Sequence, residues 1–283
     1  MTVTTSSKAQ VLMTGVVLGE SPRWRDGRLW FCDWGAQQLI ALDEAGASEV
    51  VAHVPSFPFC IDFLADGRLL IVSSAQRRVV RREPDGSMSL YAELGGLLDK
   101  PWNEIVVDGR GNAYVNSIGF NFPEGEYATG VIALVTPDGA VRQVADEVEF
   151  PNGMAITPDN STLILAESYG RRLTAFDIDP DGGLSNRRVW AEMDGHPDGI
   201  CLDAEGAVWY ADVPNQCCVR VREGGEVLQR IEIDRGCFSC ALGGADGRTL
   251  FIVAAAWGGP SSDAEPTGQV LAIQAPAPAA ERP

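Results

Sequence analysis

The chain has 283 residues, of which 45% are hydrophobic and 22% charged, a balance typical of a folded globular protein rather than of a disordered one. Its 39 acidic residues outnumber its 22 basic ones, and the formal net charge of −17 argues against nucleic-acid and anionic-membrane partners. No apolar stretch approaches the roughly 20 residues that cross a bilayer, and the N-terminus lacks the apolar segment of a signal peptide, so we expect a cytoplasmic protein.

Six copies of one pattern follow each other along the chain: an apolar segment, a tight polar turn and a second apolar or aromatic segment. The flanking segments are short and rich in Val, Ile, Leu and aromatic residues, which is typical of β-strands. A second hairpin follows each of the first five copies, as QLIALD and SEVVAHV do after the first. The turns carry residues that accept positive φ and recur every 40 to 49 residues, at Gly27, Gly67, Gly111, Asn160, Gly206 and Gly247. The repeat predicts six units of four antiparallel strands.

The sixth unit lacks its fourth strand, because the chain after Ile273 continues as QAPAPAAERP, which is too rich in Pro and Ala to form one. The segment QVLMTGVV, residues 10–17, precedes the first unit and has no other partner. We expect this N-terminal strand to complete the sixth unit and close the ring. The expected fold is therefore all-β, a six-bladed β-propeller with four antiparallel strands per blade. It forms one domain over residues 1–275, followed by a flexible tail over 276–283.

Equivalent positions at the start of each first strand should meet around the propeller axis. Counting eight residues back from the turn gives Phe59, Asn103, Asn152, Asp198 and Ser239 in units two to six, and Glu20 takes this place in unit one. Asn-Gly and Asp-Gly are also common turn residues, but the shared repeat position indicates a common site. Carboxylates held together repel each other, and a hard divalent cation removes that repulsion. A ring of oxygen ligands suits Ca²⁺ best, with Mn²⁺, Mg²⁺ and Zn²⁺ as alternatives.

The same motifs resemble those of a known family. LGESPRW, PWNEIVVDGRGNAYV, FPNGMAITPDNSTLILAES and HPDGICLDAEGAVWYADV are similar to motifs of the gluconolactonase family, which includes regucalcin and luciferin-regenerating enzyme. The similarity extends over nearly the whole chain. It implies a six-bladed propeller in which Glu20, Asn152 and Asp198 bind a divalent metal ion and Asn103 contacts the substrate. It also implies hydrolysis of a lactone.

These residues are consistent with a metal-dependent hydrolase that opens a lactone or a small activated ester with metal-activated water. Asp198 is the candidate general base toward that water, and thus the expected catalytic residue. Two alternatives stay open. One is a metal-dependent propeller that acts on another electrophile, such as a phosphotriester or a ring opened in biosynthesis, and the other is a non-catalytic calcium-binding propeller. We expect a monomer or a small homo-oligomer.

The surroundings of the expected site favour an apolar substrate. Sugar-acid lactonases of the family often carry an Arg two residues before the Asn that matches Asn103, whereas this chain has Pro101. Asn116 and Asn121 belong to segment 116–130, which is expected to form a loop over the channel and to contribute both side chains to substrate binding. The aromatic residues expected around the site are Phe57, Phe59, Trp102, Phe120, Phe122 and Trp257, of which Phe59 and Trp102 are expected to bind the substrate. The lactone or ester should carry an apolar or aromatic substituent.

Seven cysteines at irregular spacings suit reduced, buried thiols in a cytoplasmic protein. Cys237 and Cys240 form a lone CxxC, which predicts inert thiols rather than a structural zinc site. His196 is expected to be a structural residue of the rim, and Tyr169 is assigned no role.

Overall fold

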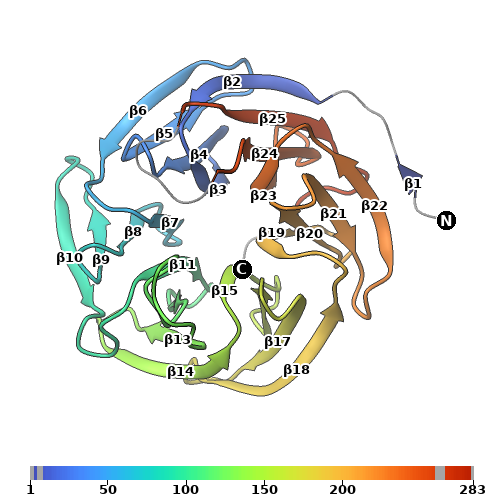
Figure 1. The fold of residues 1–283 in the computed structure, drawn as a ribbon. Helices are drawn as coiled ribbons and strands as arrows, with labels where there is room; N and C mark the ends of the chain where they lie inside the picture. Colours follow the sequence, from blue (N-terminus) through green and yellow to red (C-terminus); the bar gives the residue numbers. More distant parts are fainter. Residues whose placement is uncertain (1–2, 5–8, 259–264, 282–283) are drawn as a thin grey trace.

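Six four-stranded sheets surround a central axis in the computed structural model, which describes residues 3–4, 9–258 and 265–281 (Figure 1). Blade one consists of β3 (Gly19–Arg25), β4 (Arg28–Asp33), β5 (Gln38–Leu42) and β6 (Ser48–His53). Blade two consists of β7 (Phe59–Phe63), β8 (Leu69–Ser73), β9 (Arg78–Arg82) and β10 (Met88–Glu93). Blade three consists of β11 (Trp102–Val107), β12 (Ala113–Ser117), β13 (Gly130–Val135) and β14 (Val141–Val148).

The second half of the ring repeats this plan. Blade four consists of β15 (Pro151–Ile156), β16 (Thr162–Glu167), β17 (Arg172–Ile178) and β18 (Leu184–Glu192). Blade five consists of β19 (Pro197–Leu202), β20 (Val208–Asp212), β21 (Cys217–Val221) and β22 (Val227–Glu232). Blade six consists of β23 (Gly236–Gly243), β24 (Thr249–Ala255), β25 (Gly268–Gln274) and β2 (Gln10–Val16). The six-bladed propeller expected from the repeat is confirmed.

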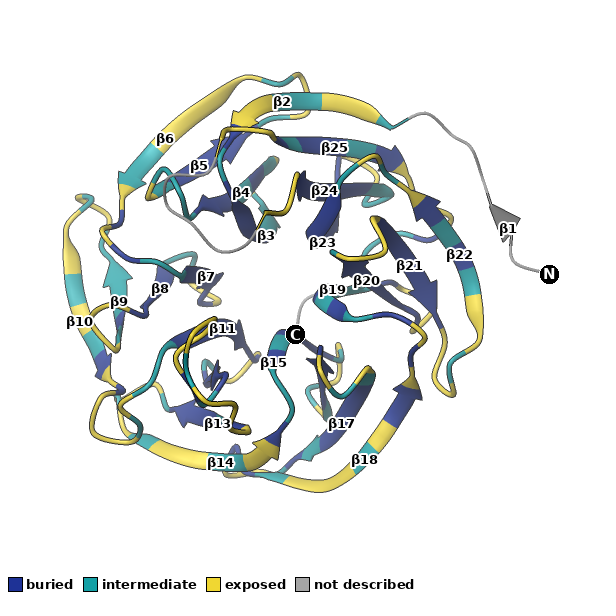
Figure 2. Ribbon diagram, in the orientation of Figure 1, coloured by how far each residue is buried: buried dark blue, intermediate teal, exposed yellow. Residues whose placement is uncertain are grey.

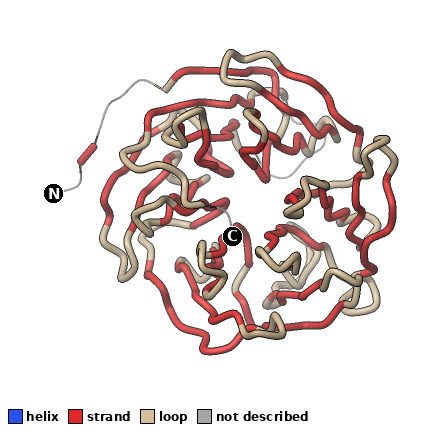
Figure 3. The backbone as a smooth tube through the Cα atoms, turned by 180° about the vertical axis from the view of Figure 1, so that it is seen from behind, coloured by secondary structure: helices blue, strands red, loops and turns tan. Residues whose placement is uncertain are grey.

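The turns have the conformation that the repeat predicts. All six turn residues have positive φ, between 58° at Asn160 and 87° at Gly67. Viewed from behind, the described residues form strands and loops only (Figure 3). Over these same residues no helix is long and apolar enough to cross a membrane.

The N-terminal strand closes the ring as expected. β2 pairs antiparallel with β25, from Gln10 opposite Ala272 to Val16 opposite Gly268. A further short strand, β1 (Val3–Thr4), adds to β22 of blade five in parallel, which the sequence did not predict. Strands of the N-terminal segment therefore pair with the outer edges of β25 and β22.

The hydrophobic core lies between the blades. An apolar cluster fills each interface between neighbouring blades, so the ring has six such clusters among the described residues. The inner strands are buried on both faces, which explains their continuous apolar runs, whereas the outermost strands alternate with exposed residues (Figure 2). Each inner strand also contacts the inner strands of both neighbouring blades. This ring of contacts positions the residues at the axis.

The segment after β25 lies against the blades instead of extending away from them. The backbone N–H of Ala204 donates to Pro278 O at 2.9 Å, and Ala279 N–H donates to Gly247 O at 2.8 Å. Ala275 and Ala277 are buried, because small apolar side chains fit under blades five and six even where Pro prevents a strand. Residues 279–281 reach the end of the channel, where they border the last residues of the inner strands. The flexibility expected of residues 276–283 stays a prediction.

Candidate functional site

A cavity of about 420 Å³ opens at the end of the channel where the inner strands begin. The four oxygen-bearing residues of the repeat position all border it, each from a different blade: Glu20, Asn103, Asn152 and Asp198. Glu20 and Asn103 are buried, while Asn152 and Asp198 are partly exposed to the cavity. The structure thus brings these four residues together.

Irregular pairing turns three of these side chains, those of Asn103, Asn152 and Asp198, toward the axis. The register between the first and second strands shifts in blades one, three, four, five and six, close to the start of the inner strand. The residues left out of register include Asn103, Asn152 and Asp198, and Phe238 in blade six, all of which border the cavity. A β-bulge re-aims a side chain in this way. Blade two pairs without a shift, from Phe59 opposite Ser73 to Phe63 opposite Leu69.

Two glycines let the inner strands approach closely beside the ligand candidates. A Cβ added to Gly153 would lie 2.6 Å from the backbone nitrogen of Ile200, and one added to Gly199 would lie 2.7 Å from the Cα of Ser239. No side chain fits at these distances, so glycine is required by crowding rather than by a turn. The Asn-Gly and Asp-Gly pairs of the sequence therefore mark contact between neighbouring inner strands.

The negative charge of the Asp198 carboxylate has few partners that stabilise it. Its Oδ1 is buried and has no hydrogen-bond partner. Burial raises the pKa of Asp198 well above its ordinary value, with further contributions from Glu104 and Asp212, while hydrogen bonding with Asn152 opposes the shift. Burial likewise raises the pKa of Glu20, and the charges of Asp198 and Glu104 add to it. The two carboxyl groups disfavour each other's ionisation.

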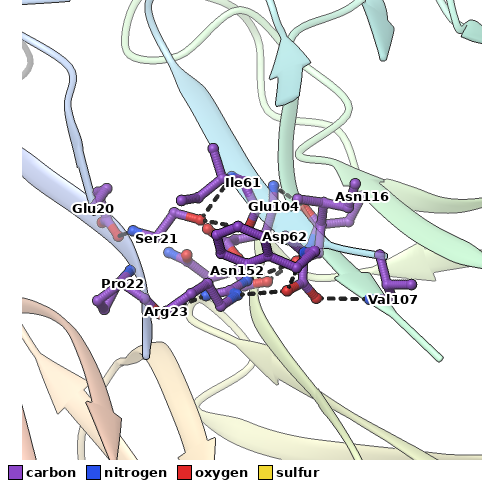
Figure 4. A network of polar contacts seen from close by, with 12 residues as sticks. Glu20, Ser21, Pro22, Arg23, Ile61, Asp62, Glu104, Val107, Asn116 and Asn152 are labelled. Atoms are coloured by element: carbon purple, nitrogen blue, oxygen red, sulfur yellow. Dashed lines mark hydrogen bonds and ion pairs between the residues drawn. The ribbon is translucent and has the colours of Figure 1, made fainter. Parts of the chain in front are cut away.

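An ion-pair network that the sequence analysis missed lies beside Glu20 (Figure 4). Arg23 Nη2 donates to Glu104 Oε2 at 3.1 Å, and Arg23 Nε lies 3.4 Å from Asp62 Oδ1. The three side chains come from blades one, two and three and are almost fully buried. Burial disfavours the charge of Arg23, but Glu104 and Asp62 outweigh it and raise the guanidinium pKa. Arg23 thus forms ion pairs with Glu104 and Asp62 rather than with Glu20 or Asp198.

Hydrogen bonds from blade three and within blade four hold Asn152. Asn116 Nδ2 donates to the Asn152 carbonyl at 2.7 Å, while Asn116 Oδ1 accepts from the backbone N–H of Glu104 at 3.2 Å. On the other side, the Asn152 amide lies 3.4 Å from Ser168 Oγ, which donates to the Pro197 carbonyl at 2.7 Å. Asn116 is fully buried and does not border the cavity. Its expected contact with substrate is therefore corrected to a contact with Asn152.

Three other expected substrate contacts do not reach the cavity. Phe59 is packed between blades one and two, and Trp102 between blades two and three; neither has exposed surface. Phe59 belongs to the strand without a bulge, and Trp102 precedes the bulge of β11, so both side chains turn into the interfaces between blades. Asn121 is exposed in the loop that follows β12 and lies outside the cavity lining.

Most of the cavity wall is apolar, as expected, but its aromatic residues are partly different. Phe57, Phe122 and Trp257 border the cavity, and Phe120 is buried behind Phe122. The sequence analysis did not place Trp34, Phe150, Phe238 and Tyr169 there. Their positions follow from contacts between blades, which leave no signal in the local sequence.

Tyr169 and His196 also border the cavity, although neither was assigned a role in it. Tyr169 stacks on Phe150 with ring centroids 4.4 Å apart. His196 Nδ1 lies 3.1 Å from the Ser168 carbonyl, which orients its ring at the rim.

The donor set is compatible with a hard divalent cation. Glu20, Asn152, Asp198 and Asn103 present carboxylate and amide oxygens, and the orphaned Asp198 Oδ1 lacks the partner that a cation would supply. Over the described part of the chain, no group of three or more His, Cys, Asp and Glu side chains is placed to hold a metal. Any cation here would therefore need amide as well as carboxylate ligands.

Comparison with known proteins agrees with this architecture. A sequence model of the family described as SMP-30/gluconolactonase/LRE-like region matches residues 18–256. Pentonolactonase XacC from Haloferax volcanii is 28% identical over 275 residues, which cover 94% of this chain and 89% of that protein. Regucalcin from Danio rerio is 26% identical over 84% of this chain and 83% of its own. Among solved structures, a luciferin-regenerating enzyme has a TM-score of 0.83 at 20% identity, covering 97% of this chain and 98% of that one, a similarity of fold.

Proposed function

The chain belongs to the SMP-30/gluconolactonase/LRE-like family, and from this premise we propose that it is a divalent-metal-dependent hydrolase that opens a lactone or a small activated ester. The observation that carries the proposal is the buried, unpartnered Oδ1 of Asp198 in a cavity shared with Glu20 and Asn152. The pentonolactonase relative supports a lactone as the reacting group.

Glu20, Asn152 and Asp198 are the proposed ligands of the cation, and Ca²⁺ is the proposed ion because oxygens from three separate blades suit its flexible geometry. When bound, a divalent cation polarises a carbonyl group and lowers the pKa of water, which are the two activations that lactone hydrolysis needs. Without it, burial raises the pKa of both Glu20 and Asp198, and the charge of Asp198 raises that of Glu20 further.

The residues of the chain have separate tasks in this proposal. Asp198 accepts the proton of the attacking water as the general base. Asn103 borders the same cavity and can donate its amide to an oxygen of the substrate. Asn116 and Ser168 are positioning residues, since they hold Asn152 between blades three and five.

The cavity wall supports an apolar or aromatic substituent on the substrate. Pro101 borders the cavity and offers no charged donor to sugar hydroxyls. Phe150 and Phe122, which pack against each other, and Trp257 supply aromatic surface to the same cavity. Such surfaces favour a flat apolar group and exclude water from the reacting carbonyl.

The experiment combines calcium binding with turnover. Isothermal titration of metal-stripped protein with Ca²⁺, Mn²⁺ and Mg²⁺ measures binding, and a pH-stat assay compares an aryl-substituted lactone with gluconolactone. We expect one cation per chain, loss of turnover in chelator and in Asp198→Asn, and a higher kcat/KM for the aryl lactone. Asp26→Asn is the matched control, because Asp26 is exposed in a turn where Asn tolerates its φ of 51°.

Three outcomes would each contradict a different part of the proposal. Full turnover in metal-stripped protein would exclude the metal mechanism. A higher kcat/KM for gluconolactone would exclude the apolar substrate. Calcium binding without turnover of any lactone or ester would favour the non-catalytic propeller instead.

A further inference from the structure

A second cavity, of about 290 Å³, lies at the opposite end of the channel, where the inner strands finish. It is bordered by the last residues of β15, β19 and β23 and by residues 279–281 of the C-terminal segment. Two cysteines belong to its lining, the half-buried Cys201 of β19 and the buried Cys240 of β23, which is 2% exposed. The proposed hydrolase makes no use of this cavity.

The two thiols belong to neighbouring blades and are in contact. Cys201 Sγ and Cys240 Sγ are 3.9 Å apart. The strands that carry them nearly touch just before this point, because a Cβ on Gly199 would lie 2.7 Å from the Cα of Ser239. A disulfide needs a sulfur separation of about 2.05 Å, and the half-buried Cys201 borders open space in which its side chain can turn.

We propose that Cys201 and Cys240 form a dithiol site that a small peroxide oxidises reversibly to a disulfide joining blades five and six. The ligand class is a hydroperoxide small enough to enter the cavity, with hydrogen peroxide as its simplest member. This inference is distinct from the proposed hydrolase activity, because neither cysteine borders the cavity that holds Asp198.

The chemistry balances in two steps. The Cys240 thiolate attacks one oxygen of the peroxide, the O–O bond breaks, hydroxide leaves and Cys240 becomes a sulfenic acid. Cys201 sulfur then attacks the Cys240 sulfur, the S–O bond breaks, and the departing hydroxide takes the Cys201 proton and leaves as water. The pair of thiols loses two electrons, and the peroxide gains them.

The surroundings distinguish Cys240 as the attacking group. Hydrogen bonds with the Cys201 and Cys218 thiols lower the pKa of Cys240 to about 5, whereas burial raises the pKa of Cys201 and of Cys218. The thiolate is the reactive form of cysteine. Cys218 and Cys237 form the competing pair, since they also hydrogen-bond to each other, but both are fully buried and neither borders the cavity.

The test oxidises the full chain with hydrogen peroxide, blocks the remaining thiols and maps the cross-link by mass spectrometry. Cleavage after Trp209 and Phe238 is needed, because it separates Cys201 from Cys217 and Cys218, and Cys240 from Cys237. We expect two of the seven thiols to be lost, a Cys201–Cys240 linkage, and full recovery of both thiols with dithiothreitol.

Variants identify the order of the steps. Cys201→Ser should form no linkage and should accumulate a sulfenic acid at Cys240 that dimedone traps. Cys240→Ser should not lose the Cys201 thiol at the wild-type rate, while the control Cys237→Ser should form the linkage as wild type does. A Cys218–Cys237 linkage in the wild-type protein, or no thiol loss at all, would overturn the proposal without the use of any variant.

Discussion

Replacing Asp198 by Asn should stabilise the metal-free protein and remove its stabilisation by calcium. In the metal-free state, Asp198 keeps a buried Oδ1 without a partner, beside the carboxyl group of Glu20. A buried charged group without a partner costs at least about 1–3 kcal/mol, and the neutral amide of Asn removes this charge and its repulsion with Glu20 without changing the shape. The variant should therefore gain up to this amount, although most substitutions at buried sites destabilise.

Calcium should reverse the order of the two proteins. A ligand at one hundred times its Kd stabilises the folded state by about 2.7 kcal/mol, which corresponds to a rise in Tm of roughly 5–10 °C for a protein of this size. The wild type should show this rise. Asp198→Asn should show little of it, because it lacks one of the two proposed carboxylate ligands.

Scanning calorimetry in chelator and in calcium measures both effects, with Asp26→Asn as the surface control. The reasoning is refuted if Asp198→Asn melts below the wild type in chelator with a native circular dichroism spectrum. It is refuted equally by a calcium shift as large as that of the wild type. Either result would mean that the Asp198 carboxylate is not a ligand of the cation.

Other predictions test the electrostatics, the corrected core residue and the cavity wall. Relative to Asp198→Asn, the metal-free wild type should gain stability on acidification, because the raised pKa of Asp198, and that of Glu20 to which its charge contributes, make the folded state bind protons first. This contribution is complete below the ordinary carboxyl pKa and is lost as the pH rises through the raised values. Tm against pH in chelator checks this, and an equal profile in Asp198→Asn would contradict it. Trp102→Ala should lower the free energy of unfolding in urea by about 3–5 kcal/mol. It should leave the KM of the residual activity unchanged, since Trp102 has no exposed surface. A raised KM would indicate that Trp102 contacts the substrate after all. Phe150→Ala should raise the KM for an aryl lactone several-fold but not that for gluconolactone, and equal changes for both would argue against a stacking role.

The blade plan could be predicted from the sequence because each unit repeats its local chemistry. Gly27, Gly67 and the other turn residues need positive φ, and the apolar runs between them are buried on both faces. The closing strand was predictable for a related reason: residues 10–17 had apolar character and no other partner. These features can be predicted from residues close to each other in the sequence or from the number of strands in each repeat.

The ion-pair network of Arg23 depends on contacts between blades, which the spacing of the repeat does not reveal. Arg23, Asp62 and Glu104 come from three inner strands and meet only when the ring closes. Each would be an ordinary exposed charge in an isolated strand. Tyr169 and Phe150 likewise stack across a turn whose conformation the residue types do not determine.

The repeat position predicted four cavity residues but placed Phe59 wrongly, and the bulges account for both results. Where the inner strand carries an extra unpaired residue, its side chain turns to the axis, as for Asn103, Asn152 and Asp198. Blade two lacks the irregularity, so the same count leads into the core at Phe59. A strand's alternation alone cannot decide between these directions, because one residue more or less reverses it. The glycines after Asn152 and Asp198 carry this information for blades four and five only, since they are required where neighbouring strands crowd together, whereas Asn103 is followed by Glu104 and still borders the cavity.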